Sequence, residues 1–418
     1  MTVIPRGWDV AIDSRIHTTL EATNPLVSLA AGAIGASEIF RQVFADFLPS
    51  GRRGPTPAGF NLLTLAGPSE ALPALPPNID IGRACLVGAG AIGQAMVYAL
   101  GTISVRGVLD VIDPEEITLS NLQRYVLSGD EDVGRTKVSV VARALKGTAI
   151  QVATGQLAWD LALPGLDAVD TVCTAVDSEA LRIEIQACLP RRAFNAWTQP
   201  SDIGWSRHEA FGVEPCLACL YWPTSPRPNY HQLVARSIRE NELRVLAYLT
   251  HDISIDAVLN PALLPQIPDM PAPSNASEWF ERSLLADVVR NFDLGEADAE
   301  AWRGRRLSDL YHDGVCGGAL IRHGSSDLSR DIAVPLAHQS ALAGVMLAAQ
   351  LLIASCPDLT AYRHPASEAR LNLLAGFPQL SARPRARTLR CICGDADFTQ
   401  RFAAKWLSPV VTPSDANA

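Results

Sequence analysis

Short apolar runs alternate with longer, helically periodic segments through the middle of the chain. The apolar runs predict strands at residues 84–87, 108–112 and 168–175, and the periodic segments predict helices that end near residue 100 and span 137–145. Strands that alternate with helices form parallel sheets with helices on both faces. The pattern therefore predicts an α/β fold built on a doubly wound, mostly parallel sheet.

The N-terminal region carries a weaker pattern. A strand is expected at 8–12 and a helix at 25–47, because Asn24 followed by Pro25 is typical of a helix start. Residues 225–330 read as a mostly helical insertion with proline-rich stretches, and long segments of this kind often handle substrates.

Patterns toward the C-terminus complete the expected core. The most apolar window, 341–353, is interrupted only by Gln350 and lies within an expected helix at 337–355. It is shorter than the roughly 20 residues needed to cross a bilayer, so it predicts a buried helix and no membrane partner. The run at 205–213 resembles an exposed strand, and another strand is expected at 370–374.

Composition narrows the possible functions. The chain has 418 residues, 48% of them hydrophobic and 19% charged, which is enough apolar material for a large core. A formal net charge of −9 opposes sequence-independent binding to nucleic acid, which requires a basic face. The first fifteen residues lack the pattern of a signal peptide, so a cytoplasmic location is expected.

A glycine turn follows the first central strand. Gly88, Gly90 and Gly93 have the spacing that lets a backbone approach phosphate closely at a helix N-terminus. This spacing fits an enzyme that binds NAD or FAD as well as one that binds ATP, and a simple turn is a further alternative.

Residues after the glycine turn favour ATP. Asp113 ends the second central strand, where an acidic side chain can bind ribose hydroxyls in either class of enzyme. Asn121, Arg124 and Lys137 are the donors needed when ATP is split between its α and β phosphates, a reaction that concentrates negative charge. Asp177, at the end of a buried strand, is placed to hold Mg²⁺, although a helix N-cap is the alternative for this residue.

The run at 113–124, followed by Gly134-Arg135-Thr136-Lys137, resembles the adenylation motif of the ThiF/MoeB/E1 superfamily. The resemblance covers about residues 80–220 and 310–395. It implies that Asp113 binds ribose, that Asn121, Arg124 and Lys137 contact the triphosphate, and that Asp177 coordinates magnesium.

The cysteines suggest two further sites. Cys216 and Cys219 form a knuckle, and Cys391 and Cys393 lie near the C-terminus. Four thiolates can close a structural zinc site, and the superfamily has two such knuckles, although the second one here is CxC rather than CxxC. A redox pair is the competing interpretation. Cysteines in apolar patterns are expected in the core, namely Cys85, Cys173, Cys188 and Cys356.

Cys316 stands between glycines, in Gly314-Val315-Cys316-Gly317-Gly318, where a thiol would be accessible. The segment resembles the catalytic-cysteine loop of compact E1 enzymes, which implies that Cys316 forms a thioester. A turn cysteine without function is the alternative.

The resemblance also implies an organisation and partners. The expected segments are an N-terminal strand and helix extension at 1–78, the nucleotide-binding half of an adenylation domain at 79–224, a helical insertion with the cysteine loop at 225–330, the C-terminal half at 331–407 and a disordered tail at 408–418. The implied substrate is the C-terminal carboxylate of a ubiquitin-like protein, the acceptor is an E2-like conjugating protein, and the assembly is a homodimer. Many relatives place an N-terminal arginine in a neighbouring ATP site. Arg6 or Arg15 could substitute here, although a solvated surface arginine is the favoured interpretation of each.

The Asn24-Pro25 helix start and the Cys-x-Cys-Gly-Asp run at 391–395 resemble bacterial E1-like proteins that occur with ubiquitin-like, E2-like and JAB-peptidase partners in operons linked to antiphage defence. Activation of a sulfur-carrier protein, without an obligatory thioester, is the second hypothesis. A dinucleotide-binding oxidoreductase or a nucleotide-binding scaffold is the third.

Overall fold

The computed structural model describes most of the chain outside one long central segment, namely residues 2–13, 24–48, 58–66, 72–159, 161–162, 169–199, 202–222, 336–374, 379–388 and 390–407. Contacts divide the chain into two units, Met1–Trp222 with Pro335–Ala418, and Pro223–Val334. All of the described residues belong to the first unit. The expected insertion at 225–330, its Cys316 and the tail at 408–418 lie outside them.

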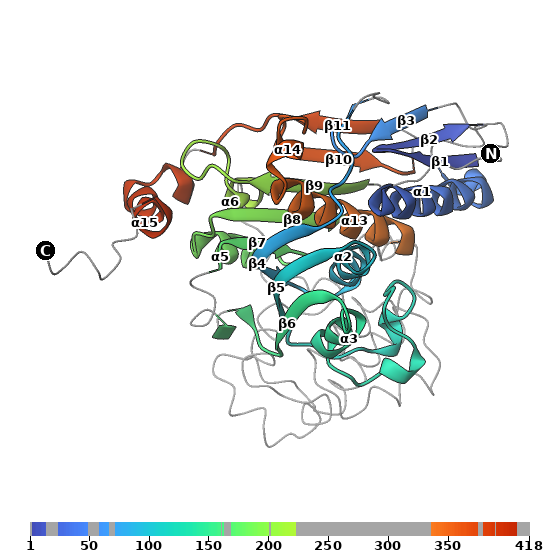
Figure 1. Cartoon of the computed structure of the whole chain (residues 1–418), viewed down its shortest axis with the longest axis horizontal. Coiled ribbons are helices and arrows are strands. Elements are labelled where there is room, and N and C mark those ends of the chain that lie inside the picture. Colours follow the sequence, from blue (N-terminus) through green and yellow to red (C-terminus); the bar gives the residue numbers. More distant parts are fainter. Residues whose placement is uncertain are drawn as a thin grey trace, which may run out of the picture. The chain divides into compact units, whose positions relative to one another are not determined.

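An eight-stranded sheet forms the centre of the described unit (Figure 1). Its strands are β4 Ile79–Val87, β5 Val105–Ile112, β6 Ala149–Gly155, β7 Thr171–Thr174, β8 Arg192–Thr198, β9 Asp202–His208, β10 Glu368–Asn372 and β11 Gln379–Arg383. Their spatial order is β11-β10-β9-β8-β7-β4-β5-β6. The five strands from β8 to β6 are parallel, and β9, β10 and β11 extend the sheet in antiparallel fashion. The predicted doubly wound, mostly parallel sheet is confirmed.

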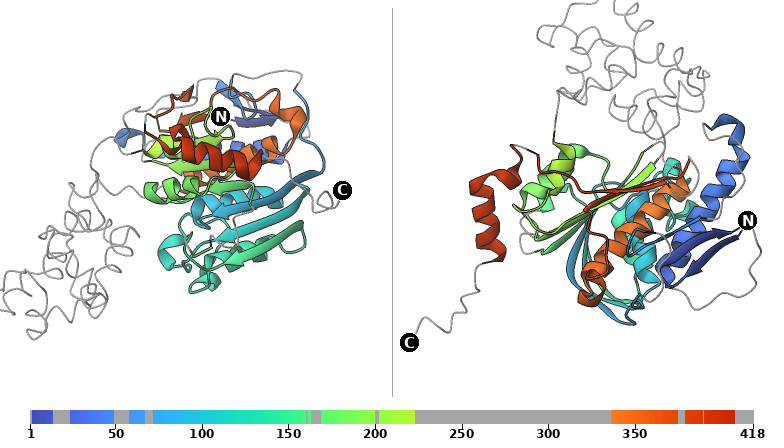
Figure 2. Two further views of the ribbon diagram at one scale, coloured as in Figure 1. Left: turned by 90° about the vertical axis from the view of Figure 1, so that its left-hand side faces the viewer. Right: turned by 90° about the horizontal axis from the view of Figure 1, so that it is seen from above.

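Helices cover both faces of this sheet (Figure 2). Alternate residues of a strand point to opposite faces, so in β4 Leu86 joins one apolar cluster and Cys85 another. The first cluster includes α2 Ala91–Gly101, α3 Lys137–Ala144 and α13 Ala337–Ala354, and the second includes α5 Glu179–Ala187 and α6 Leu217–Tyr221. Two further helices, α14 Pro357–Thr360 and α15 Ala396–Trp406, follow α13 in the chain.

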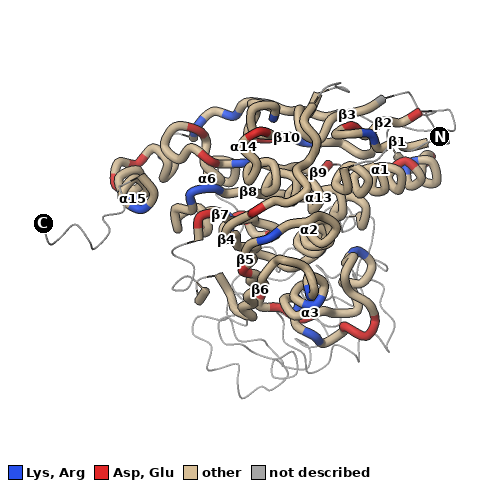
Figure 3. The backbone as a smooth tube through the Cα atoms, in the orientation of Figure 1, with Lys and Arg blue, Asp and Glu red and all other residues tan. Residues whose placement is uncertain are grey.

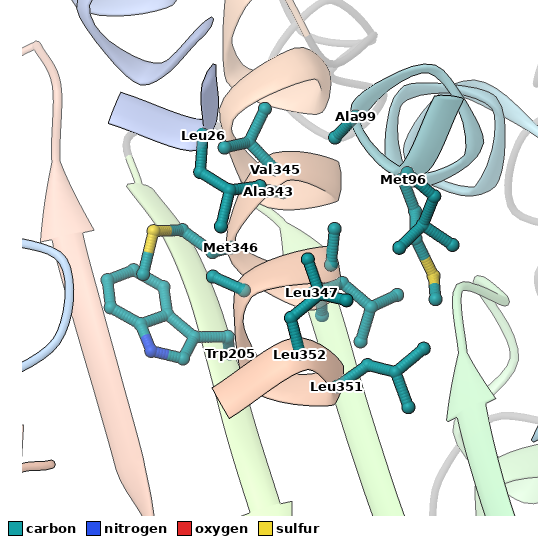
Figure 4. Packing of buried hydrophobic residues seen from close by; sticks show 14 of the residues in the cluster. Leu26, Met96, Ala99, Trp205, Ala343, Val345, Met346, Leu347, Leu351 and Leu352 are labelled. Atoms are coloured by element: carbon teal, nitrogen blue, oxygen red, sulfur yellow. The ribbon is translucent and has the colours of Figure 1, made fainter. Parts of the chain in front are cut away.

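Helix α13 is the core of the first layer. Every residue from 342 to 353 is buried, and the helix packs against α1, α2, β8 and β9. Figure 4 shows its side chains between Leu26, Met96 and Trp205, and Figure 3 shows no charged position along it. Among the described helices it is the one long and apolar enough to span a membrane, but 78% of that apolar window is buried inside the fold. The prediction of a buried helix is confirmed.

The N-terminal extension forms a small antiparallel sheet of β1 Thr2–Arg6, β2 Asp9–Asp13 and β3 Ala58–Asn61, packed on α1 Pro25–Val43. Asn24 caps α1 as predicted, because its side chain accepts a hydrogen bond of 3.0 Å from the Leu26 amide. The helix ends at Val43 rather than at residue 47, and a short 3₁₀ turn, η1 Ala45–Phe47, follows. Pro49 disfavours helical geometry at the residue before it, which is consistent with this earlier end.

The expected exposed strand at 205–213 is wrong in both extent and exposure. Strand β9 ends at His208, because a turn closed by the Val213 amide and the Ala210 carbonyl follows, with Gly212 at a φ of +85°. The strand pairs with β8 on one side and β10 on the other. Trp205 is therefore covered by the α13 layer and is only 2% exposed.

Candidate functional site

The glycine turn lies where β4, β5 and β7 end together. The Gly88 amide donates to the Ile112 carbonyl, and the Ala175 amide donates to the Val87 carbonyl, both at 2.9 Å. A Cβ atom at residue 88 would lie 2.7 Å from the Ala175 oxygen, and one at residue 93 would lie 2.0 Å from the Gly88 oxygen. Neither position has room for a side chain, so both glycines are required for the close approach of these strands and α2.

Asp113 fixes this turn to the end of β5. One carboxylate oxygen accepts the Ala89 amide at 2.8 Å and the other accepts the Glu115 amide at 2.9 Å. Burial raises the pKa of Asp113, and the charge of Lys137 and the two amide donors oppose that rise. Each oxygen retains further acceptor capacity. The carboxylate is thus buried, oriented and adjacent to the glycine turn.

Lys137 begins α3 directly after the N-cap Thr136. The residue is only 5% exposed. Its ammonium group pairs with the Glu115 carboxylate and lies 5.6 Å from the centre of the Tyr125 ring. Burial alone would lower the pKa of Lys137. Interactions with Tyr125, with Asp113 and with Glu115 outweigh that effect and hold the pKa above its ordinary value. The lysine is therefore a buried group that stays charged at neutral pH.

Tyr125 is a part of this cluster that the sequence interpretation missed. It is buried, its hydroxyl oxygen is the nearest heavy atom to a Cβ built at Gly90, at 3.3 Å, and the Arg124 guanidinium lies 5.7 Å from its ring centre. The available signal was an aromatic residue directly after an arginine in a polar loop. The cations of Arg124 and Lys137 both lie within 6 Å of its ring centre, an arrangement typical of cation–π contacts.

Arg124 and Asn121 lie on the loop between β5 and α3. The Asn121 side chain accepts a hydrogen bond of 3.0 Å from the Thr118 amide within the turn η2 Leu119–Asn121. The Arg124 guanidinium donates to the Ser120 carbonyl at 3.4 Å and is partly exposed. Asn121 thus shapes the loop, while Arg124 makes no ion pair among the described residues.

Two buried polar contacts hold this loop against the fold. The side-chain oxygen of Gln94, in the first turn of α2, accepts from the Leu127 amide at 3.2 Å and from the Ser128 hydroxyl at 3.0 Å. Asp132, in the turn η3 Asp130–Asp132, is fully buried and pairs with Arg143 of α3. Hydrogen bonds from Arg143 are the main reason that the pKa of Asp132 is lowered to about 2.

Asp177 is exposed just beyond the end of β7. The N-cap of α5 is Ser178, whose hydroxyl accepts from the Leu181 amide at 3.2 Å, so the alternative interpretation of Asp177 as the helix cap is wrong. Ala175, two residues before it, contacts Gly88. The Asp177 carboxylate therefore lies just after the strand end that meets the glycine turn.

The cysteines of the two knuckles come together although 174 or 175 residues separate them. The Sγ atoms of Cys216, Cys219, Cys391 and Cys393 all lie within 4.8 Å of one another and are buried. Three separations are 3.4, 3.5 and 3.9 Å, close to the roughly 3.8 Å edge of a zinc tetrahedron with bonds of about 2.3 Å. The cluster could hold zinc. Cys391 and Cys393 flank a short turn, η7 Ile392–Gly394.

A doubly wound sheet whose glycine turn, acidic strand end and buried lysine meet at one edge defines a nucleotide-binding α/β protein. The chain belongs to the ThiF family, whose sequence profile matches residues 78–387. Its class is that of E1-like, ATP-dependent adenylylating enzymes. This assignment favours adenylylation over the dinucleotide oxidoreductase hypothesis.

Three relatives illustrate the range of the family. The uncharacterized protein y4jF of Sinorhizobium fredii is 34% identical over 402 residues, which is 93% of this chain and 71% of that protein. The adenylyltransferase and sulfurtransferase MOCS3 of Anopheles gambiae is 32% identical over 149 residues, 34% of this chain and 33% of that one. The SAMP-activating enzyme E1 of Haloferax volcanii is 38% identical over 65 residues, 16% of this chain and 24% of that enzyme. The match thus spans about a third or less of the two relatives with named activities.

Among solved structures, Escherichia coli MccB in complex with MccA-N7isoASN is similar at 15% identity and a TM-score of 0.42, covering 75% of this chain and 67% of MccB.

Proposed function

We propose that this chain uses ATP and Mg²⁺ to adenylate the C-terminal carboxylate of a ubiquitin-like protein, and that Cys316 then forms a thioester for transfer to an E2-like conjugating protein. The observation that supports it is the meeting of Asp113, Tyr125 and Lys137 beside a glycine turn, with Arg124 on the Tyr125 ring. Fixed positive charge at a phosphate-binding turn suits a reaction that develops charge on phosphate.

The residues divide the work of adenylation. Asp113 orients the ribose, Asn121, Arg124 and Lys137 neutralise the triphosphate, and the glycine amides at 88–93 receive a phosphate. Magnesium on Asp177 would neutralise the pyrophosphate leaving group. A carboxylate is already ionised at neutral pH, so the first step needs no general base.

Two displacements then follow. A carboxylate oxygen of the partner attacks the α-phosphorus, the bond to the bridging oxygen of the β-phosphate breaks, and pyrophosphate leaves. In the second step the Cys316 thiolate attacks the carbonyl carbon of the acyl-adenylate and AMP leaves as the thioester forms. Cys316 lies outside the described residues, so its role rests on its sequence context alone.

Further parts of the proposal concern the assembly. Zinc bound by Cys216, Cys219, Cys391 and Cys393 would be structural, because four buried thiolates leave no open coordination position. The functional unit would be a homodimer in the cytoplasm, acting on protein partners rather than on nucleic acid or a membrane. A role in antiphage defence is proposed by resemblance to bacterial E1-like proteins.

Activation of a sulfur-carrier protein is the second candidate. It is favoured by the match to relatives named adenylyltransferase and sulfurtransferase. In that case the acyl-adenylate would be consumed by a sulfur donor and Cys316 would be dispensable.

Partner-dependent ATP–pyrophosphate exchange tests the proposal. The purified chain, Mg²⁺, ATP and labelled pyrophosphate are combined with a ubiquitin-like protein encoded nearby, and with the same protein lacking its last residue. We expect exchange with the intact partner only. Equal exchange with both partners, or none with any candidate, contradicts the proposal.

Cys316→Ala distinguishes the two candidates. The variant should retain pyrophosphate exchange while losing a reductant-sensitive conjugate with the partner on non-reducing gels. A conjugate that persists in the variant assigns the thioester to another cysteine. A wild-type chain that exchanges pyrophosphate without ever forming a conjugate favours sulfur-carrier activation.

A further inference from the structure

Arg182 is a buried cation that forms no salt bridge within 4 Å among the described residues. It is 4% exposed and lies on α5. Its guanidinium donates to the Val176 carbonyl and lies 4.7 Å from the centre of the Tyr221 ring, while its Nε atom is buried with no hydrogen-bond partner in the described part of the chain. Burying a charge that is not fully paired is costly, so this placement calls for a role.

The position of Arg182 connects it to Asp177. Val176, whose carbonyl it holds, immediately precedes Asp177, and the Asp177 carboxylate interacts electrostatically with the Arg182 guanidinium. Arg182 thus fixes the backbone that carries this carboxylate.

The support for Arg182 comes from the cysteine knuckle. Tyr221 is the last residue of α6, the five-residue helix whose N-cap is Cys216 and which contains Cys219. The Tyr221 hydroxyl accepts from the Asn195 side-chain nitrogen Nδ2 at 3.0 Å, and the Asn195 side-chain oxygen accepts from the Thr174 hydroxyl at 2.8 Å. Thr174 ends β7, so Tyr221 is tied to the strand that leads to Asp177.

Two more side chains fix α6 in place. The His208 ring nitrogen Nδ1 lies 2.8 Å from the Pro215 carbonyl, directly before Cys216, and Nε2 lies 3.0 Å from the Ser206 hydroxyl. The Leu217 amide donates to the Gln186 side chain on α5 at 2.8 Å. A displacement of α6 would therefore shift Arg182, because Arg182 contacts Tyr221 of α6 and lies on α5, which α6 also contacts.

We infer that Arg182 is a positioning residue for the magnesium carboxylate Asp177, and that Tyr221 couples it to the cysteine cluster, so that an intact cluster is needed for magnesium-dependent nucleotide binding. The inference rests on the proposed function, since Asp177 must hold Mg²⁺. Arg182 and Tyr221 affect only binding of the metal–nucleotide complex, so nucleotide binding without Mg²⁺ does not depend on them.

Calorimetric titration with a non-hydrolysable ATP analogue, with and without Mg²⁺, tests the first half. Arg182→Met should weaken binding in the presence of Mg²⁺ about tenfold, as is typical when a residue that orients a metal ligand is lost, and should leave Mg²⁺-free binding at the wild-type level. Arg182→Lys should restore part of the loss. Wild-type affinity in Arg182→Met, or an equal loss with and without Mg²⁺, overturns the assignment.

A double-mutant cycle tests the coupling. Cys393→Ser, which alters the cluster from the far end of the chain, should weaken Mg²⁺-dependent binding in the wild type but add little to Tyr221→Leu. Tyr221→Phe, which keeps the ring, should act much less than Tyr221→Leu. Thermal unfolding of each variant checks that it is folded at the temperature of the titration.

Additive losses from Cys393→Ser and Tyr221→Leu would overturn the coupling. If the unaltered chain binds the analogue no better with Mg²⁺ than without it, the proposed function fails and this inference fails with it. Normal Mg²⁺-dependent binding in the wild type together with additive losses overturns the coupling alone.

Discussion

Tyr125 lies against both basic side chains of the proposed site, with Lys137 at 5.6 Å and Arg124 at 5.7 Å from its ring centre. Each cation–π contact is worth on the order of 0.5–2 kcal/mol depending on burial. The hydroxyl end of the Tyr125 side chain also lies beside Gly90 in the glycine turn. The Tyr125 side chain thus contacts Arg124, Lys137 and the glycine turn and fixes their relative positions.

Tyr125→Leu should therefore lower kcat/KM for pyrophosphate exchange about tenfold, because both cations lose their aromatic support. Tyr125→Phe keeps the ring and should stay within about twofold of the wild type. Steady-state exchange kinetics, with thermal unfolding to confirm folding, measure the difference. Equal rates in the two variants would assign no role to the ring.

Asp132→Asn should destabilise the loop by about 1–3 kcal/mol, since Arg143 would lose its ionised partner. The pKa of Asp132 is lowered to about 2 in the folded chain, so its contribution to stability is complete above the ordinary carboxyl pKa and is lost as pH falls from there toward about 2. Urea unfolding should show a gap between wild type and variant near neutral pH that narrows in acid. The exposed neighbour Asp130, changed to Asn, is the control and should change little.

Gly344 sets the contact between the helices α13 and α2. A Cβ atom there would lie 2.5 Å from both the Ala95 Cβ and the Ile92 carbonyl oxygen. Alanine ordinarily stabilises a helix interior relative to glycine by about 0.5–1 kcal/mol. Here the packing term opposes the helix propensity, because two backbones approach too closely for a methyl group.

Gly344→Ala is expected to lower the free energy of unfolding by about 1–3 kcal/mol through overpacking. Gly32→Ala on α1 is the matched control, since a Cβ there meets nothing within 4 Å, and it should be neutral or slightly stabilising. Denaturant unfolding of both variants measures the contrast. A stable Gly344→Ala would mean that α13 and α2 lie farther apart.

How well the elements could be predicted depended on burial. β4 and β5 are apolar runs because both faces are covered, and Asn24 before Pro25 marks the start of α1. β6 was missed because its outer residues face solvent and break the apolar run, and β8 was missed because Asn195 and Arg192 interrupt it. The burial of Trp205 in β9 could not be predicted, since it depends on packing against α13, which lies far later in the chain.

At the scale of the whole molecule, the cysteine cluster joins α6 to the C-terminal region. The spacing of the cysteines predicted that these residues belong together, and the structure brings all four Sγ atoms within 4.8 Å. Attachment of α15 could not be predicted, since Lys405 and Trp406 donate to carbonyls at the end of α5, at Cys188 and Leu189. These contacts involve residues 217 positions apart, beyond the reach of any local pattern.

We predict about one zinc ion per chain, held by four thiolates. Cys216→Ser should lose the metal and lower the unfolding temperature, because the ion links segments far apart in sequence. Cys188→Ser lies outside the cluster and should keep the zinc. Elemental analysis of the three proteins decides the matter, and zinc-free wild type with full stability would contradict the prediction.

We propose that this chain forms an acyl-adenylate with the residues at the carboxyl edge of its parallel strands. Partner-dependent ATP–pyrophosphate exchange, measured side by side for the wild type, Arg124→Ala and Asp177→Ala, tests it most directly. Both side chains are at least partly exposed, so neither variant should unfold. The wild type should exchange pyrophosphate, and each variant should be slower by at least about a hundredfold, as when a charge contact to the transition state is removed. Exchange at the wild-type rate in both variants would contradict the account.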